Sequence, residues 1–270
     1  MFMEQLDSTV LATALPTMAR SFNVSPLHMS AALTSYLLGL ALFIPASGYF
    51  ADRFGSRRIF RLAIAVFTVG SILCGQAGSL PFLVAARLLQ GIGGAMMVPV
   101  GRLVLLRTVP MKDFVTAMSW LMIPALLGPV VGPPLGGFIV SYLSWRWIFY
   151  INVPIGILGM YLATVFIEEI REPDPGQFDL RGFLLSSISL SCLMYGLEMA
   201  SRGGGTSRGV TTGIIVTGLV AGLAYAGHAR RESNPILDFR LMRVPTFGIS
   251  VIGGALTRIT GGALPFLLPM

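Results

Sequence analysis

The feature that most constrains this chain is a short charged loop, residues 48–58, between two long apolar segments. The loop reads Gly-Tyr-Phe-Ala-Asp-Arg-Phe-Gly-Ser-Arg-Arg. Residues 28–48 before it carry no acidic or basic side chain apart from His28, and residues 62–86 after it carry none. Each segment can supply the run of about 20 residues that a helix needs to cross a membrane. The sequence therefore predicts two membrane-spanning helices joined by a hairpin.

The rest of the chain repeats this pattern of apolar segments and short charged loops. Nine spans are predicted, at about residues 1–19, 28–50, 59–79, 81–105, 114–140, 147–167, 180–199, 210–227 and 244–270. The chain is 54% hydrophobic and only 11% charged, whereas soluble proteins are about 25% charged. The predicted fold class is an all-α polytopic membrane protein. Both cysteines, Cys74 and Cys192, lie inside apolar spans, so neither a disulfide framework nor a metal site is expected.

Basic residues are concentrated in alternate loops. If the loop at 48–58 is cytoplasmic, the loops on that side hold Arg53, Arg57, Arg58, Arg61, Arg107, Lys112, Arg171, Arg181, Arg230, Arg231, Arg240 and Arg243. The predicted outer loops hold only Arg20, Arg146, Arg202 and Arg208. Because short loops rich in Lys and Arg stay on the cytoplasmic side, we expect a cytoplasmic N-terminus. The expected location is a bacterial inner membrane. Topology also accounts for the net charge of +7, so no nucleic-acid partner is expected.

The charged loop resembles the signature of the major facilitator superfamily, Gly-x-x-x-Asp-Arg-x-Gly-x-(Arg/Lys)-(Arg/Lys), between helices 2 and 3. The matching residues are Gly48, Asp52, Arg53, Gly55, Arg57 and Arg58. The resemblance implies a cytoplasmic gate in which Asp52 contacts a second helical bundle. The plainer interpretation is a loop whose arginines set the topology and whose aspartate only neutralises them.

The predicted fourth span resembles the helix-4 motif of the same superfamily, Arg-x-x-Gln-Gly-x-Gly. Arg87, Gln90 and Gly91 carry the match and share one helix face because they are three or four residues apart. An arginine inside a membrane helix is costly unless it faces a wet cavity or a counter-charge. This face is therefore predicted to point toward the interior of a bundle.

The predicted fifth span contains a stripe of glycine and proline: Gly128, Pro129, Gly132, Pro133, Gly136 and Gly137. Glycines four residues apart give a smooth face on which another helix can pack closely. Prolines remove helical hydrogen bonds, so a bend is expected here. The spacing also resembles the antiporter motif found in exporters of the superfamily and generally absent from its uptake symporters, although ordinary small-residue packing is the alternative.

The first span and the start of the sixth resemble the fourteen-helix drug/proton antiporters. The first contains Leu-Asp-Ser-Thr-Val-Leu-Ala-Thr-Ala-Leu-Pro, and the sixth begins around Trp-Arg-Trp-Ile-Phe-Tyr-Ile-Asn-Val-Pro. Asp7 is expected about 16 Å deep in the membrane, within reach of Arg87 if helices 1 and 4 face one cavity. Asp7 and Arg87 are the predicted proton-coupling residues, with a cationic substrate and a proton competing for Asp7. The alternative is a structural pair that never titrates.

The motifs follow family order along almost the whole chain. The resemblance implies a six-helix bundle at 1–167, a linker with two extra transmembrane helices at 168–243, and the first helix of an incomplete second bundle at 244–270. It implies proton-coupled efflux of a small amphipathic or cationic compound across the lipid bilayer by alternating access, with the C-terminal bundle of the same polypeptide missing. No cofactor and no enzymatic chemistry are expected. A non-transporting membrane fragment or partner subunit, or an uptake symporter, are the alternatives.

Overall fold

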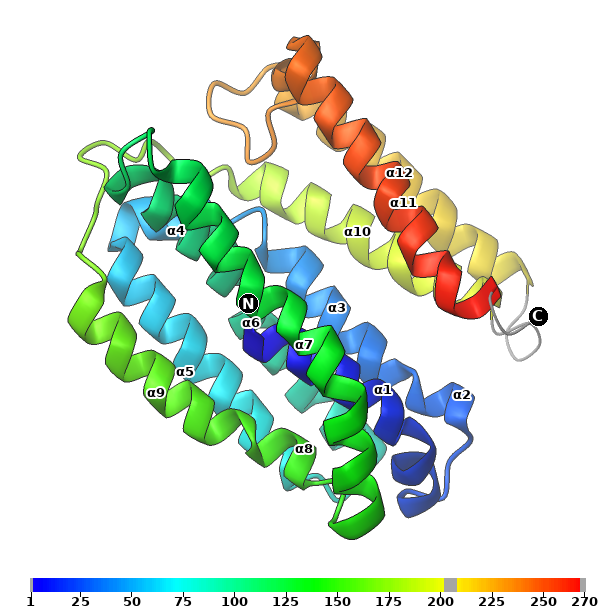
Figure 1. Ribbon diagram of the computed structural model, residues 1–270. Helices are drawn as coiled ribbons and strands as arrows, with labels where there is room; N and C mark the ends of the chain where they lie inside the picture. Colours follow the sequence, from blue (N-terminus) through cyan, green and yellow to red (C-terminus); the bar gives the residue numbers. More distant parts are fainter. Residues whose placement is uncertain (1, 202–207, 268–270) are drawn as a thin grey trace.

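The computed structural model describes residues 2–201 and 208–267, and each of the nine predicted spans contains helix there; residue 1 of the first span and residues 268–270 of the ninth lie outside the described residues. The described residues contain helices and no strand (Figure 1). The helices that correspond to the nine spans are, in order, α1 (Phe2–Ser21), α3 (Ala31–Phe43) with α4 (Ser47–Phe54), α5 (Ser56–Gly75), α6 (Leu80–Thr108), α7 (Phe114–Tyr142), α8 (Trp147–Tyr150) with α9 (Asn152–Phe166), α10 (Leu180–Ser201), α11 (Arg208–Ala229) and α12 (Pro245–Leu267). Two short elements, α2 (Pro26–Met29) and η1 (Phe239–Arg243), lie between them.

Six of the described helical segments are long and apolar enough to cross a membrane: α5, α6, α7, α8 with α9, α10 and α11. The α3 and α4 pair makes a seventh if it is counted as one span. Helix α1 is less apolar because it carries Glu4, Asp7 and Arg20. The prediction of an all-α polytopic membrane protein is confirmed.

A proline breaks the second span, whereas the prolines of the fifth span do not divide it. Helices α3 and α4 meet at an angle of 55° around residues 44–46, where Pro45 lacks the N–H that would continue the helix. Helix α7 runs without interruption from Phe114 to Tyr142 and contains Pro129 and Pro133. A bend was expected in α7 from its prolines, whereas the break at Pro45 was not predicted from the sequence.

Helix α6 occupies the centre of the packing between α3 and α5, and glycines permit the close approach. A Cβ atom added at Gly91 would lie 2.3 Å from the carbonyl oxygen of Tyr36 on α3. One added at Gly93 would lie 2.4 Å from the backbone nitrogen of Phe67 on α5. Contacts this short exclude any side chain, so the glycines of the helix-4 motif bring the three backbones together.

Helices α10 and α11 form a hairpin beside the other helices, next to α3 (Figure 1). Ser189 donates to the carbonyl oxygen of Gly218 over 2.9 Å and so joins α10 to α11. At the start of α10 the Gly182 N–H donates to Asp179 Oδ1 over 2.8 Å. This hydrogen bond satisfies one of the N–H groups that a helix start leaves free.

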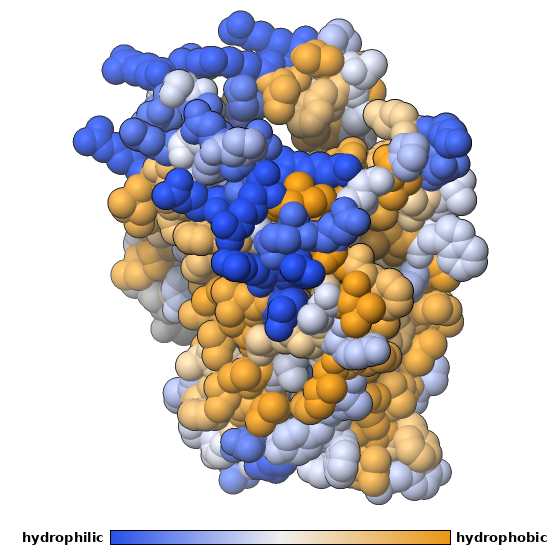
Figure 2. Space-filling model, turned by 90° about the vertical axis from the view of Figure 1, so that its left-hand side faces the viewer, coloured by the Kyte–Doolittle hydropathy of each residue, from blue (hydrophilic) through white to orange (hydrophobic). Residues whose placement is uncertain are grey.

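Hydrophilic side chains gather at one end of the molecule, above a largely hydrophobic flank (Figure 2). The turn between α4 and α5 and the segment after α9 lie at this end (Figure 1). We call it the basic end because it includes Arg53, Arg57 and Arg58 of the charged loop. An apolar flank with a polar end is the surface expected of a protein that contacts lipid.

Candidate functional site

Asp7 on α1 and Arg87 on α6 form an ion pair in the interior of the bundle. Arg87 Nη1 lies 2.5 Å from Asp7 Oδ2, and both side chains are 0% exposed. Buried charges are costly unless they are paired and hydrogen-bonded. The structure therefore brings together the two residues that the sequence analysis expected to meet.

Two uncharged side chains complete the coordination of the Asp7 carboxylate. Gln90 Nε2 donates to Asp7 Oδ1 over 3.0 Å, and its Oε1 accepts from Arg87 Nη1 over 2.7 Å. Asn152 on α9 donates to the same Asp7 oxygen over 3.2 Å and to Ser71 Oγ on α5 over 3.0 Å. One carboxylate thus connects α1, α6 and α9, with α5 reached through Ser71.

The Arg87 guanidinium is also held between two aromatic rings. Its Cζ lies 4.4 Å from the ring centroid of Tyr36 on α3 and 5.9 Å from that of Phe149 on α8. Aromatic faces attract cations, more strongly where water is excluded. Arg87 Nε also donates to the carbonyl oxygen of Ala32 over 3.3 Å. These contacts fix Arg87 independently of its pairing with Asp7.

Sequence reasoning did not single out Asn152 or Ser71 for this site. Asn152 belongs to the Trp-Arg-Trp motif at the start of the sixth span, and the structure gives it 0% exposure. An amide just inside an apolar span was the available signal, since a buried amide needs hydrogen-bond partners. Ser71 carried no comparable signal. Its hydroxyl donates to the backbone carbonyl of Phe149, and a backbone carbonyl is offered by every residue type.

The glycine stripe of α7 packs against α1, the helix that carries Asp7. A Cβ at Gly128 would lie 2.6 Å from Gln5 Cβ, and one at Gly132 would lie 2.0 Å from Thr9 Oγ1. A Cβ at Gly136 would lie 2.2 Å from Thr13 Oγ1. The prediction of a smooth face for close helix packing is confirmed. The remaining stripe residues lie on the exposed side of α7: Pro129, Pro133 and Gly137.

At the basic end, the charged loop contacts α6 rather than only its own arginines. Arg107 Nη1 donates to Asp52 Oδ1 over 2.8 Å. Gly55 adopts a φ of +98°, in the left-handed region that favours glycine. Gly48 lies within α4, and a Cβ added there would meet nothing within 4 Å among the described residues.

A segment that follows α9 lies across this loop; we call residues 168–172 the acidic strap. The Ser56 N–H donates to the Ile170 carbonyl over 3.0 Å, and the Glu172 N–H donates to the Asp52 carbonyl over 3.2 Å. Glu169 Oε2 lies 3.5 Å from Arg57 Nε. The sequence predicted that this segment belongs to a linker, and its contacts with the loop were not expected.

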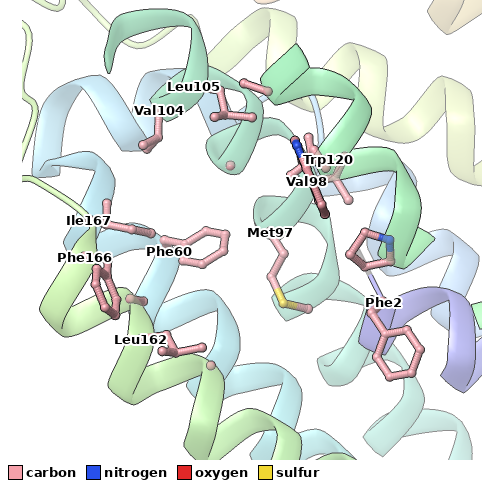
Figure 3. A pocket seen from close by; sticks show the side chains of 16 residues that line it. Phe2, Phe60, Met97, Val98, Val104, Leu105, Trp120, Leu162, Phe166 and Ile167 are labelled. Atoms are coloured by element: carbon pink, nitrogen blue, oxygen red, sulfur yellow. The ribbon is translucent and has the colours of Figure 1, made fainter. Parts of the chain in front are cut away.

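A cavity of about 660 Å³ lies near the basic end, between α5, α6, α7 and α9. Its walls include Phe60, Met97, Trp120 and Phe166 (Figure 3). No charged side chain is among the described residues that line it. Its lining suits apolar groups and offers nothing to orient an ion.

Three side chains near the start of α10 bring possible metal ligands together. Oxygen and nitrogen atoms of Asp179, His228 and Glu232 lie within 4.8 Å of one another. However, Asp179 Oδ1 already accepts from the Gly182 N–H and lies 2.8 Å from His228 Nε2. We therefore assign this cluster to the packing of α11 on the start of α10.

Comparison with a protein-family model and with curated relatives gives consistent results. The model described as Major Facilitator Superfamily matches residues 1–268. Proteins with the provisional name multidrug resistance protein MdtD, from Pectobacterium carotovorum subsp. carotovorum and from Salmonella newport, are 45% identical over 269 residues. The alignment covers 100% of this chain and 57% of each relative. The chain therefore spans 57% of the length of these relatives.

Two solved structures share the fold. The human organic anion transporter MFSD10 (TETRAN) superimposes with a TM-score of 0.56 at 16% identity, over 77% of this chain and 55% of that protein. A bacterial homologue of the human lysosomal transporter Spinster, inward-facing and occupied, gives 0.53 at 22% identity, over 84% and 57%. At these identities the likeness concerns the arrangement of the helices.

Proposed function

Because this chain belongs to the major facilitator superfamily, we propose that it is the N-terminal part of a proton-coupled exporter of small amphipathic or cationic compounds. Its relatives are named for multidrug resistance and share 45% of their residues with it over the aligned length. The observation that carries the proposal is the enclosed Asp7–Arg87 pair, because ionisable residues inside a membrane bundle commonly form proton relays.

The proposed architecture follows the family. Residues 1–167 form the N-terminal six-helix bundle, residues 168–243 a linker with two extra membrane helices, and residues 244–270 the first helix of a second bundle. The hairpin of α10 and α11 supports this division. Its two helices pack mainly on each other, and α10 contacts the first bundle at α3. The C-terminal bundle of the same polypeptide is the proposed partner that completes the transport path.

The basic end is proposed to be cytoplasmic, in a bacterial inner membrane. Its support is the density of arginine in the loop between α4 and α5, since such loops are retained on the cytoplasmic side. This orientation places the N-terminus in the cytoplasm. Transport of this kind leaves the compound chemically unchanged and only transfers protons, so the proposal includes no cofactor and no enzymatic activity.

The proposed coupling rests on the cost of leaving a buried charge alone. A proton on Asp7 removes its negative charge, while Arg87 remains cationic and enclosed. Removing one partner of a buried ion pair costs about 3–5 kcal/mol. Shifting a two-state equilibrium from 1:99 to 99:1 takes about 5.5 kcal/mol. Protonation of Asp7 would thus supply most of the free energy needed to favour a different arrangement of α1 and α6, which is what alternating access requires.

The test is Asp7→Asn in the full-length polypeptide, reconstituted into vesicles with an imposed pH gradient and a fluorescent cation such as ethidium. Export driven by the gradient is expected to stop, while downhill exchange of the cation persists. Asp174→Asn is the matched control, because Asp174 is exposed in the segment before α10. Export that still responds fully to the gradient in Asp7→Asn would remove Asp7 from the coupling step.

The same vesicles separate the proposal from its rivals. An uptake symporter would accumulate the compound together with protons, so the direction of movement at a fixed gradient distinguishes it from an exporter. A partner subunit without transport activity would move no compound in either direction. The proposed exporter moves the compound against its gradient only when protons flow the opposite way.

A further inference from the structure

A second cavity, of about 450 Å³, opens between α1, α3 and α6. It differs from the apolar cavity of Figure 3 in that ionisable side chains line it. Glu4 contributes a carboxylate and Arg102 a guanidinium, while Leu37, Leu40 and Val98 supply apolar surface. A concave apolar surface with a few polar groups is the usual form of a small-molecule site.

Glu4 and Tyr36 both lie beside Gly94 in the wall of this cavity. A Cβ added at Gly94 would lie 3.4 Å from Glu4 Oε1 and 3.2 Å from Tyr36 Oη. Both residues are buried, with exposures of 8% and 3%. The Tyr36 hydroxyl has no hydrogen-bond partner among the described residues. The Glu4 carboxylate and the Tyr36 hydroxyl thus border the same space. Gly94 has no side chain that would fill it.

Asp7 does not border this cavity. Its side chain is 0% exposed and is enclosed by Arg87, Gln90 and Asn152. A compound large enough to fill the cavity therefore cannot reach Asp7 in this conformation. This geometry argues against the expectation that substrate and proton compete for Asp7, because Glu4 and not Asp7 is the carboxylate that lines the cavity.

Arg102 lies away from Gly94, beside which Glu4 and Tyr36 lie. It is eight residues further along α6 than Gly94, which corresponds to about 12 Å at 1.5 Å per residue. Its side chain is exposed, whereas Glu4 is buried. Solvent weakens the influence of an exposed charge, so the inner part of the cavity is governed by the carboxylate.

We propose that this cavity is a subsite for an organic cation, in which the Glu4 carboxylate binds the cationic group and Tyr36 borders it. This inference rests on the proposed export function and names the residue that recognises the compound. Leu37, Leu40 and Val98 contact the apolar groups around the charge. Tyr36 links the two sites, because its hydroxyl borders the cavity while its ring lies over Arg87. Substrate and proton therefore act on separate carboxylates that are joined through Tyr36 and Arg87.

The test is binding of tetraphenylphosphonium, a permanent cation, and of triphenylphosphine oxide, a neutral compound of related shape, to the purified full-length polypeptide in lipid nanodiscs. Glu4→Gln is expected to weaken tetraphenylphosphonium binding by about tenfold or more, as loss of a buried charge partner does. Binding of the neutral compound is expected to change less than about twofold. Arg102→Gln is the control, since it removes a positive charge from the same cavity. It is expected not to weaken the binding of tetraphenylphosphonium.

Glu4→Asp tests whether the effect comes from charge or from packing. It keeps the carboxylate on a side chain shorter by one methylene, so it is expected to retain tetraphenylphosphonium binding within about threefold. Three results would overturn the subsite: no binding by the wild type, an unchanged affinity in Glu4→Gln, or equal losses for the cation and the neutral compound. A loss in Glu4→Asp as large as in Glu4→Gln would also overturn it.

Failure of the subsite can be told apart from failure of the proposed function. Cation binding that does not depend on Glu4, together with export that depends on Asp7, would reject the subsite alone. Binding that depends on Glu4, together with export that ignores the pH gradient in the wild type, would reject proton coupling alone. The two readouts use different variants, so neither result masks the other.

Discussion

Arg107 on α6 donates from Nη1 to Asp52 Oδ1 over 2.8 Å, which ties the charged loop to the end of a neighbouring helix. Arg107 Nη2 also lies 3.6 Å from Glu172 Oε2, so one guanidinium joins the loop, the helix and the acidic strap. The Arg107 and Asp52 side chains are 29% and 28% exposed. Ion pairs near the surface contribute only about 0–1 kcal/mol. This cluster is therefore suited to exchanging partners during a conformational change.

Asp52→Asn is expected to reduce export several-fold while changing the free energy of unfolding by less than about 1 kcal/mol. The expected reason is that Asp52 exchanges Arg107 for a partner in the second bundle when the gate closes. Export from vesicles, together with the amount of protein inserted in the membrane, measures the two effects separately. Full export by Asp52→Asn would leave the loop with a role in topology only.

Gly55→Ala is expected to lower the free energy of unfolding by about 1–2 kcal/mol. An alanine at a φ of +98° is strained, and its Cβ would overlap Glu169 Oε1 of the acidic strap. Thermal unfolding in detergent measures the change. Gly48→Ala is the control, because an added Cβ there meets nothing within 4 Å among the described residues. Equal melting temperatures for both variants would show that the strap does not constrain this turn.

Gly132→Ala is expected to destabilise the contact between α7 and α1 by about 1–3 kcal/mol, the usual cost of overpacking. The added Cβ would lie 2.0 Å from Thr9 Oγ1, so one of the two helices must move. Gly137→Ala on the exposed side of the same helix is the matched control. If both variants unfold at the same temperature, the stripe is not a close-packing face.

The sequence could predict the parts of the site in which a buried charge requires a counter-charge or a row of glycines requires a closely packed helix. An arginine in an apolar span requires a counter-charge, and Asp7 was the acid placed deepest in a span, so the Asp7–Arg87 contact followed. Glycines at a spacing of four require a helix packed closely against them. That this helix is α1 did not follow, because the spacing describes one surface and carries no information about its neighbour.

The parts that sequence did not predict depend on contacts between residues far apart in the chain. Asn152 and Ser71 are uncharged, and although a buried amide needs hydrogen-bond partners, a single sequence does not say which residues supply them. The acidic strap crosses the charged loop through backbone hydrogen bonds, which any residue type can make. The break at Pro45 is a local feature, but prolines in α7 do not divide that helix. The outcome depends on how the folded bundle satisfies the backbone groups that each proline frees, which the proline itself does not reveal.

A double-mutant cycle on Asp7 and Arg87 is expected to give strong coupling. Arg87→Met leaves the buried Asp7 carboxylate with Gln90 and Asn152 as its hydrogen-bond donors among the described residues, and should lower the free energy of unfolding by about 3–5 kcal/mol. Adding Asp7→Asn removes that charge, so the double variant should recover much of the loss. Thermal unfolding in detergent is the measurement, with Arg20→Met on the exposed end of α1 as the control.

The same double variant separates stability from coupling. Because it contains neither charge, it is expected to fold well and yet to show no export driven by a pH gradient. Single losses that simply add in the double variant would mean that the two side chains do not stabilise one another. A double variant that folds and still exports in response to the gradient would place the proton elsewhere, and Glu4 would then be the next carboxylate to test, since it lines the cavity that borders Tyr36.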